Sequence, residues 1–127
     1  MAERIEAWES EQIPDEDSLY MRVHRNDLDA DGNPIPGAFR NRPKGGNSMS
    51  TDWERYTTAL DSIARARNPA QVIMIAMETG VVRQVPGQTV EHTPDVESNN
   101  RAHTDVTGEK TTAARAKFMD AYWHIPT

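Results

Sequence analysis

The feature that most constrains this fold is a continuous apolar run at residues 72–77, with the sequence VIMIAM. The run is rich in β-branched side chains, and it is bounded by Pro69 and Gly80, which interrupt regular structure. Such a run is typical of a strand that is covered on both of its faces. We therefore expect residues 72–77 to form a buried strand at the centre of the core.

The rest of the chain predicts an α+β fold with a small, mostly antiparallel sheet. Apolar residues at helical spacing favour a helix at residues 58–67, which is entered through residues 50–56. The same spacing favours a C-terminal helix at residues 110–124, packed across one face of the sheet. A short helical turn is expected at residues 81–83. Further strands are expected at residues 19–23, 88–92 and 101–107.

A chain of 127 residues without cysteine is the size of one domain. The lack of cysteine excludes disulfides, thiolate zinc sites and cysteine nucleophiles, and it makes the cytoplasm the expected location. The longest apolar run is far too short to cross a bilayer, and the acidic start MAERIEAWESEQ lacks the features of a signal peptide. We therefore expect a soluble protein that is neither exported nor bound to membranes.

Charge divides the chain into an acidic leader at residues 1–18 and a single domain at residues 19–127. Residues 1–20 hold seven acidic residues against one basic residue, which leaves thirteen of each in the remainder. The leader is either a solvated arm or a docking segment for a basic partner surface. Within it, Ile5 and Trp8 are spaced for a short amphipathic turn, in which Trp8 either docks on the core or forms a partner-binding hot spot.

One stretch begins like a calcium-binding loop but does not complete one. The opening DxDxDG pattern is matched by Asp27, Asp29, Asp31 and Gly32. Position twelve of the pattern, which should supply a bidentate glutamate, is Ala38. An Asp-Gly pair between extended segments more often forms a hairpin turn, so we predict a turn here and no metal site.

The only basic cluster lies in a proline- and glycine-rich loop at residues 38–47, where Arg40, Arg42 and Lys44 alternate. Alternating guanidinium groups and exposed glycine amides favour anions, so this loop could bind phosphate. The alternative is a mobile surface loop with solvated charges. Three basic residues in a neutral body fall short of a nucleic-acid footprint, so nucleic-acid binding through this loop is the less favoured option.

Most of the side chains capable of chemistry gather at residues 90–108, where two expected strands flank a polar loop. Pairing of these strands would bring His92 nearly opposite His103. Period-two alternation then places Asp105 on the same face as His103. We therefore expect the two imidazoles and the carboxylate to share one surface.

This surface has three interpretations. As a catalytic site, it supplies an imidazole base together with a carboxylate that sets its tautomer. As a metal site, it is completed by His24 or a water. As a structural hairpin end, which we favour, its histidines bond to backbone groups while Asp105 and Asn99 or Asn100 satisfy turn amides. No serine elbow, Walker loop, HExxH or dinucleotide motif is present, and we predict no cofactor.

Short motifs along the chain resemble those of a group of small bacterial proteins to which no activity is assigned. The motifs are Leu19-Tyr20-x-Arg22-Val23-His24, Ala38-Phe39-Arg40, Ser50-x-Asp52-Trp53, Val90-x-His92-x-Pro94 and Asn100-Arg101-Ala102-His103, followed by Gly108. The resemblance runs from about residue 19 to the end and leaves out the acidic leader. It implies a compact intracellular bacterial domain, and it carries no cofactor or catalytic residue.

Two functions are consistent with these features. The first, which we favour, is an interaction or accessory protein of a larger bacterial system, such as a mobile element or a defence system. It would bind a protein partner through the acidic leader and through exposed aromatic side chains. Those aromatic candidates are Trp8, Trp53 and Trp123.

The alternative is a small hydrolase or transferase that acts on a nucleotide or nucleic acid. His103 is then the general base, Asp105 orients it, and His92 is a second acid or ligand. His24 completes the candidate catalytic set. The candidate phosphate-binding residues are Arg40, Arg42 and Arg101.

Overall fold

The computed structural model describes residues 7–44 and 46–126 and has the α+β fold expected from the sequence. Six strands form one antiparallel sheet in the order β4-β5-β2-β1-β3-β6. The strands are β1 (Ser18–His24), β2 (Ser48–Trp53), β3 (Val72–Glu78), β4 (Thr89–His92), β5 (His103–Thr107) and β6 (Tyr122–Ile125). The helices are α1 (Ala59–Ala64), α2 (Thr79–Arg83) and α3 (Thr112–Ala121), and short 3-10 turns include η2 (Pro36–Ala38). No helix within the described ranges has the length and apolar character needed to cross a membrane.

The apolar run at residues 72–77 forms most of β3 and lies inside the sheet, as predicted. β3 pairs with β1 at seven positions and with β6 at four. Met74, Ile75, Ala76 and Met77 are each 1% exposed or less. Because successive side chains of a strand point to opposite faces, both faces of β3 are covered here.

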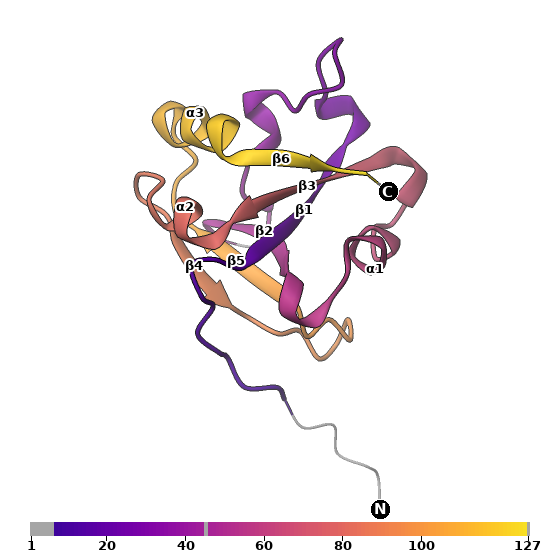
Figure 1. Cartoon of the computed structure of the whole chain (residues 1–127), viewed down its shortest axis with the longest axis vertical. Helices are drawn as coiled ribbons and strands as arrows, with labels where there is room; N and C mark the ends of the chain where they lie inside the picture. The colour runs from indigo at the N-terminus through magenta and orange to yellow at the C-terminus, as the bar shows by residue number, and fades with distance from the viewer. Residues whose placement is uncertain (1–6, 45, 127) are drawn as a thin grey trace, which may run out of the picture.

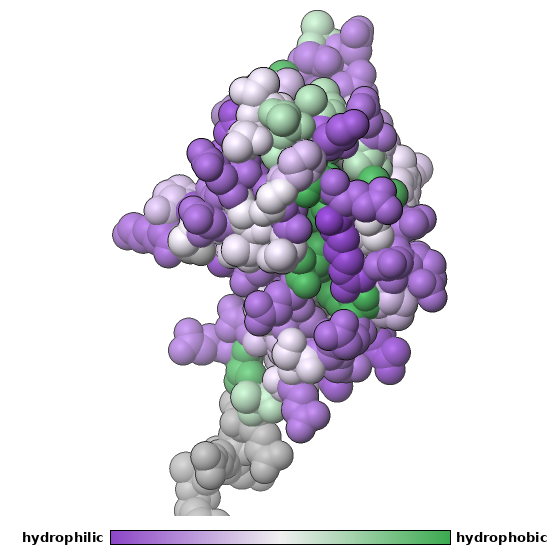
Figure 2. Space-filling view, turned by 90° about the vertical axis from the view of Figure 1, so that its left-hand side faces the viewer, coloured by the Kyte–Doolittle hydropathy of each residue, from purple (hydrophilic) through white to green (hydrophobic). Residues whose placement is uncertain are grey.

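One face of the sheet carries the hydrophobic core, which is covered by α2, α3 and η2. Buried side chains of this face include Leu19, Met21, Met49, Trp53, Ile75, Met77 and Val106. Phe118 of α3 is fully buried and stacks on Phe39, with ring centroids 5.2 Å apart. α2 and α3 lie on the left in Figure 1, and α1 lies on the right. Seen from the side of α2 and α3, the surface is mainly hydrophilic with a narrow hydrophobic strip (Figure 2).

The opposite face of the sheet is polar and is partly covered by α1. The cross-strand pairs Tyr20↔Asp52, Asp52↔His103 and Ser50↔Asp105 show that these side chains share this face. α1 was expected to bury an apolar stripe, but Leu60 is 63% exposed and the buried residue is Ser62. The reason is that α1 lies on the polar face, where the Ser62 hydroxyl donates to the carboxylate of Asp52 at 2.6 Å.

The sheet opens between β1 and β2, its two central strands. These strands pair at only two positions, Leu19↔Trp53 and Tyr20↔Asp52. Beyond Tyr20, β1 continues along β3, while β2 continues along β5 over five positions. The segment that follows η2 lies against this opening, where the Arg42 amide donates to the Ser48 carbonyl at 2.9 Å. The opening is therefore lined by two strands and by the basic loop.

Two segments differ from the expected elements. The C-terminal helix ends at Ala121 rather than near residue 124, and the chain continues as β6. Aromatic and β-branched residues suit a strand, and the edge of β3 provides a partner for them. Residues 50–53, part of the expected helix entrance at residues 50–56, lie in the central strand β2. Its alternating Met49, Thr51 and Trp53 face the core, whereas the intervening residues face the polar side.

The described part of the acidic leader packs on the domain. Ile13 is buried, and the Glu11 amide donates to Nδ1 of His92 at 3.0 Å. The Asp17 carboxylate accepts from the Trp53 indole at 2.9 Å. Residues 10–17 are therefore not a solvated arm. Ile5 of the expected amphipathic turn lies outside the described residues.

The aspartate-rich stretch forms a turn, as predicted. Leu28 and Pro34 form an antiparallel bridge, and Gly32 has a positive φ of 83°. The Asp29 carboxylate accepts from the amides of Asp31 and Asn33 at 2.9 and 3.0 Å. This carboxylate is therefore engaged in holding the turn.

Candidate functional site

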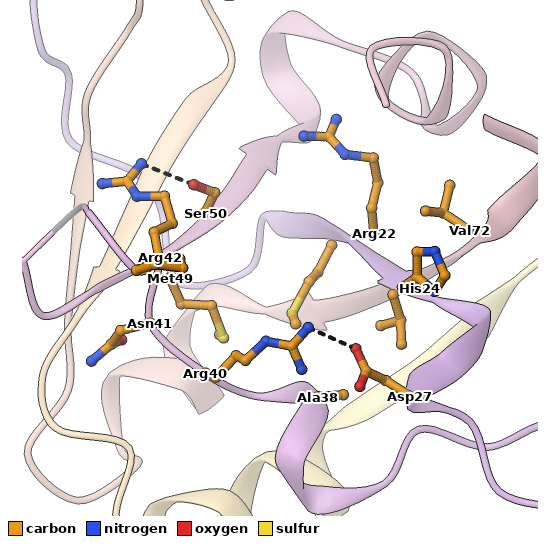
Figure 3. A pocket seen from close by; sticks show the side chains of 13 residues that line it. Arg22, His24, Asp27, Ala38, Arg40, Asn41, Arg42, Met49, Ser50 and Val72 are labelled. Atoms are coloured by element: carbon orange, nitrogen blue, oxygen red, sulfur yellow. Dashed lines mark hydrogen bonds and ion pairs between the residues drawn. The ribbon is translucent and has the colours of Figure 1, made fainter. Parts of the chain in front are cut away.

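The opening between β1 and β2 holds a pocket of about 290 Å³, which we call the fork pocket (Figure 3). Its walls come from three short segments within residues 21–50 and from Val72 of β3. They are Met21, Arg22, Val23, His24 and Asp27 at β1, Met49 and Ser50 of β2, and Ala38, Arg40, Asn41, Arg42 and Pro43 of the basic loop, together with Val72. The pocket exists because the two central strands separate after two paired positions.

The fork pocket combines apolar side chains with the side chains of three arginines, Arg22, Arg40 and Arg42. Met21, Val23 and Met49 contribute buried apolar surface. Arg40 points toward Asp27 and pairs with it at 2.9 Å, and Arg42 points toward Ser50 (Figure 3). Both arginine side chains are partly exposed, and a guanidinium offers five donors, so each can also contact a bound anion.

A second pocket of about 290 Å³ adjoins the first, and we call it the His103 pocket. It is lined by Arg22, Ser50, Arg65, Ser98, Asn100 and His103. Arg22 and Ser50 line both pockets. Ser50 therefore borders two cavities, of which the fork pocket is lined by three arginines and the His103 pocket by two.

Asp52 organises the inner end of the His103 pocket. Its carboxylate is 3% exposed and accepts from Ser62 at 2.6 Å and from Asn100 at 2.8 Å. Arg22 and Arg65 approach the same carboxylate at 3.4 and 3.3 Å. The carboxylate thereby ties α1, β1 and the loop before β5 to β2. None of these interactions was anticipated from the sequence.

His103 has one tautomer that fits its surroundings. Its Nδ1 lies 3.0 Å from the Thr93 carbonyl oxygen, which can only accept, and 2.9 Å from the Thr93 hydroxyl, which can accept as well. The Arg42 guanidinium beside Nε2 can only donate, so the proton is on Nδ1. Nε2 then holds the lone pair and lies 3.3 Å from Ser50 Oγ and 3.2 Å from an Arg42 nitrogen. Asp105 was expected to orient this ring, but its carboxylate is 4.0 Å from Nε2 and pairs with Arg42 at 3.2 Å. The group that orients His103 is the Thr93 carbonyl.

His92 does not share a surface with His103 and Asp105, so this part of the prediction was wrong. His92 pairs with Thr104, and a shift of one position in register moves a side chain to the other face. Its ring is 1% exposed and packs against Trp53, with centroids 5.0 Å apart. Nδ1 accepts from the Glu11 amide, so Nε2 donates to the Arg101 carbonyl at 2.7 Å. For His92 the structure matches the structural interpretation.

The remaining candidate residues are divided between the pockets and other regions. His24 lines the fork pocket, and its Nδ1 accepts from the Asn26 amide at 3.0 Å. Arg101 does not line either pocket and lies over the Tyr56 ring, 4.2 Å from its centroid. Lys44 is exposed and also lies outside both linings. Of the expected phosphate-binding residues, the fold brings together Arg40 and Arg42.

Of the tryptophans expected to be exposed, Trp53 is buried and Trp8 and Trp123 are partly exposed. Trp53 is 1% exposed because it lies on the core face of β2. Trp123 is 42% exposed on the edge strand β6. Trp8 lines a separate open pocket with Glu11, Tyr56 and Arg101, among others. Only Trp8 and Trp123 are therefore open to a partner.

Lys110 holds the basic loop in place through a hydrogen bond to Asn41. Its ammonium group donates to Asn41 Oδ1 at 2.6 Å and to the carbonyl oxygens of Gly108 and Val106 at 2.7 and 3.1 Å. Burial lowers the pKa of Lys110 to about 8. Asn41 lines the fork pocket, so this contact helps to place the neighbouring arginines.

Sequence reasoning assigned no catalytic or binding role to Arg22, Ser50, Asp52 or Arg65, and it gave Asn100 only a structural role, as an alternative to Asn99, in bonding turn amides. The alternation of polar residues in β1 and β2 was the available signal, because it puts Arg22, Ser50 and Asp52 on one face once both segments are known to be strands. Within residues 7–44 and 46–126, no group of three or more His, Asp or Glu side chains is placed to hold a metal ion. Comparisons with protein-family models, with curated proteins and with solved structures gave no match.

Proposed function

We propose that this protein binds a nucleotide in the fork pocket and acts on its phosphate ester, as a small hydrolase or transferase. The observation that carries the proposal is the separation of β1 and β2, which creates a cavity lined by both guanidinium groups and apolar side chains. Small-molecule sites are commonly apolar cavities with a few well-placed polar groups.

The arginines account for the phosphate part of this ligand. Guanidinium groups match phosphate oxygens in a bidentate geometry and remain charged at every physiological pH. Arg40 and Arg42 line the fork pocket, and Arg22 and Arg65 line the adjoining cavity. Asp27, Asp52 and Asp105 pair with these arginines, which leaves one excess positive charge. A bound phosphate group would neutralise this excess positive charge.

The apolar wall accounts for the base or sugar. Met21, Val23 and Met49 present side chains that are 2–5% exposed, next to the partly buried Val72. Methionine adapts to flat ring systems because its side chain is unbranched and polarizable. The volume of about 290 Å³ lies at the lower end of the usual range of about 300–1,000 Å³, and the adjoining pocket extends it.

Isothermal titration of the full chain with AMP, ADP, ATP and inorganic phosphate tests this proposal. We expect a nucleotide to bind and Arg40→Gln to weaken its binding about 10-fold or more, as for a lost hydrogen bond to a charged group. Lys44→Gln is the matched control, because Lys44 carries the same charge in the same loop but lies outside both pockets. Failure of every nucleotide to bind, or an equal loss in Lys44→Gln, would overturn the proposal.

A second candidate function, a protein-binding accessory role, is favoured by the surface around Trp8. This residue lies 6.0 Å from the Arg101 guanidinium, and both line an open pocket with Tyr56. Exposed tryptophan, tyrosine and arginine are the residue types enriched in binding hot spots. Co-purification from the host with Trp8→Ala and Trp123→Ala variants tests it. A partner lost equally from both variants, or from neither, would contradict a role for the Trp8 surface.

A further inference from the structure

We propose that Ser50 is a nucleophile and that His103 is the general base that activates it. The two residues would transfer a phosphoryl group from a bound phosphate ester to the Ser50 hydroxyl. This inference rests on the proposed function for the identity of the substrate. The inference goes beyond the proposed function because it assigns a covalent mechanism and names the residue that carries the transferred phosphoryl group.

The position of Ser50 suits a nucleophile. It lies on β2, is partly exposed, and lines both the fork pocket and the His103 pocket. Its oxygen accepts a hydrogen bond from Arg42 at 2.9 Å, so the hydroxyl proton is free to be donated elsewhere. A phosphate ester held by the arginines of the two pockets would therefore lie next to this oxygen.

The tautomer of His103 supplies the base. With the proton on Nδ1, Nε2 carries the lone pair, and its neighbours are Ser50 Oγ at 3.3 Å and an Arg42 nitrogen at 3.2 Å. Such distances between a base and its nucleophile commonly shorten when a substrate binds. A nucleophile, a base and a group that orients the base are the parts shared by hydroxyl-activating sites. Here the third part is a backbone carbonyl rather than a carboxylate.

Two charged groups flank the pair, and each has a role in the proton transfer. An Arg42 nitrogen lies 3.2 Å from Nε2 and stabilises negative charge that develops on Ser50 Oγ. Asp105 pairs with Arg42 and lies 4.0 Å from Nε2, where it would stabilise the imidazolium once the proton has moved. Arg42 Nε is buried and lacks an acceptor in the described part of the chain.

The proposed reaction needs only the phosphate ester and water as reactants. Ser50 Oγ forms a bond to phosphorus while the bond from phosphorus to the leaving-group oxygen breaks. The hydroxyl proton moves to His103 Nε2 and then to the departing oxygen. In the second half, water attacks the phosphoserine, Nε2 takes a proton from the water, and that proton returns to Ser50. An alcohol in place of water makes the same sequence a transfer reaction.

A fluorophosphonate reagent tests the nucleophile directly, because it forms a stable bond only with an activated hydroxyl. We expect mass spectrometry of the treated full chain to find one adduct, on Ser50. His103→Gln should slow labelling about 100-fold or more, the range for a lost general base. Ser48→Ala is the matched control, because Ser48 lies on the same face of β2 and bonds only to Thr107 Oγ1 among described side chains. It should leave the rate unchanged.

The pH profile of the wild-type protein provides a test that needs no variant. Labelling of Ser50 should slow as the pH is lowered, because an imidazole that is already protonated cannot accept the serine proton. A folded wild-type protein that is not labelled on Ser50, or a rate that is insensitive to both His103→Gln and pH, would overturn the proposal. These negative results are expected if the contact between Ser50 and His103 is only a structural hydrogen bond.

Nucleotide titrations separate this inference from the proposed function. Nucleotide binding by a wild-type protein that the reagent does not label would refute the Ser50 mechanism alone. Labelling of Ser50 in a protein that binds no nucleotide would refute the proposed substrate and leave the nucleophile established. We expect Ser50→Ala to lose labelling and to bind nucleotide within about 10-fold of wild type, since it removes a single hydrogen-bonding group.

Discussion

Asp52→Ala should strongly destabilise the protein, because Asp52 joins four segments through one buried carboxylate. The substitution removes its hydrogen bonds with Ser62 at 2.6 Å and Asn100 at 2.8 Å and leaves Arg22 and Arg65 without their acidic partner. Hydrogen bonds to a charged group contribute about 1.5–3 kcal/mol each, and breaking a buried ion pair costs about 3–5 kcal/mol. Because the two arginines are partly solvated, we expect a loss of about 3–5 kcal/mol in the free energy of unfolding.

Equilibrium urea unfolding followed by tryptophan fluorescence measures this loss. Asp120→Ala is the control, because Asp120 is exposed on α3 and its removal should change the free energy of unfolding by about 0.5 kcal/mol or less. Asp52→Asn keeps the shape of the side chain and should be less harmful than alanine. A loss below about 1 kcal/mol for Asp52→Ala would refute the assignment of Asp52 as the group that ties these segments together.

Two further predictions concern the buried side chains of Lys110 and Phe118. The pKa of Lys110 is lowered from 10.5 to about 8, so between these pH values the unfolded chain binds a proton that the folded chain does not, and stability rises with pH. Relative to Lys110→Met, the free energy of unfolding of the wild type should rise by about 1–2 kcal/mol between about pH 7.5 and pH 10, after allowance for partial solvation. A difference in urea midpoint between the two proteins that is the same at both pH values would contradict this. Phe118→Ala removes a fully buried ring that stacks on Phe39, and it should cost about 3–5 kcal/mol in urea unfolding. A loss below about 1 kcal/mol would show that the α3 contact is not part of the core.

Local patterns in the sequence were sufficient for most of the elements. The run at residues 72–77 predicted the buried strand β3, and the residues of β1, β4 and β5 were also expected to be extended. β2 was missed because its polar residues were assigned to a helix entrance. Its alternation becomes meaningful only when β1 and β5 lie on either side of it.

The candidate site was predicted in part. His103 and Asp105 share a face, because alternation within one strand determines which side chains point the same way. His92 was placed with them on an assumed register that was wrong by one position. Register depends on contacts made by both strands with the rest of the core, and these contacts cannot be read from either segment alone. Arg22 and Ser50 became candidates only when the separation of β1 and β2 placed them in shared pockets.

The sequence by itself therefore determined the buried strand and the faces within single strands. Those properties depend on local composition and on the two-residue period of an extended chain. The tertiary structure decided the strand order, the register of β4, the opening between β1 and β2, and the approach of His103 to Ser50. Those properties arise from many weak contacts between segments up to 91 residues apart, as with Asn33 and His124, and no short pattern encodes them.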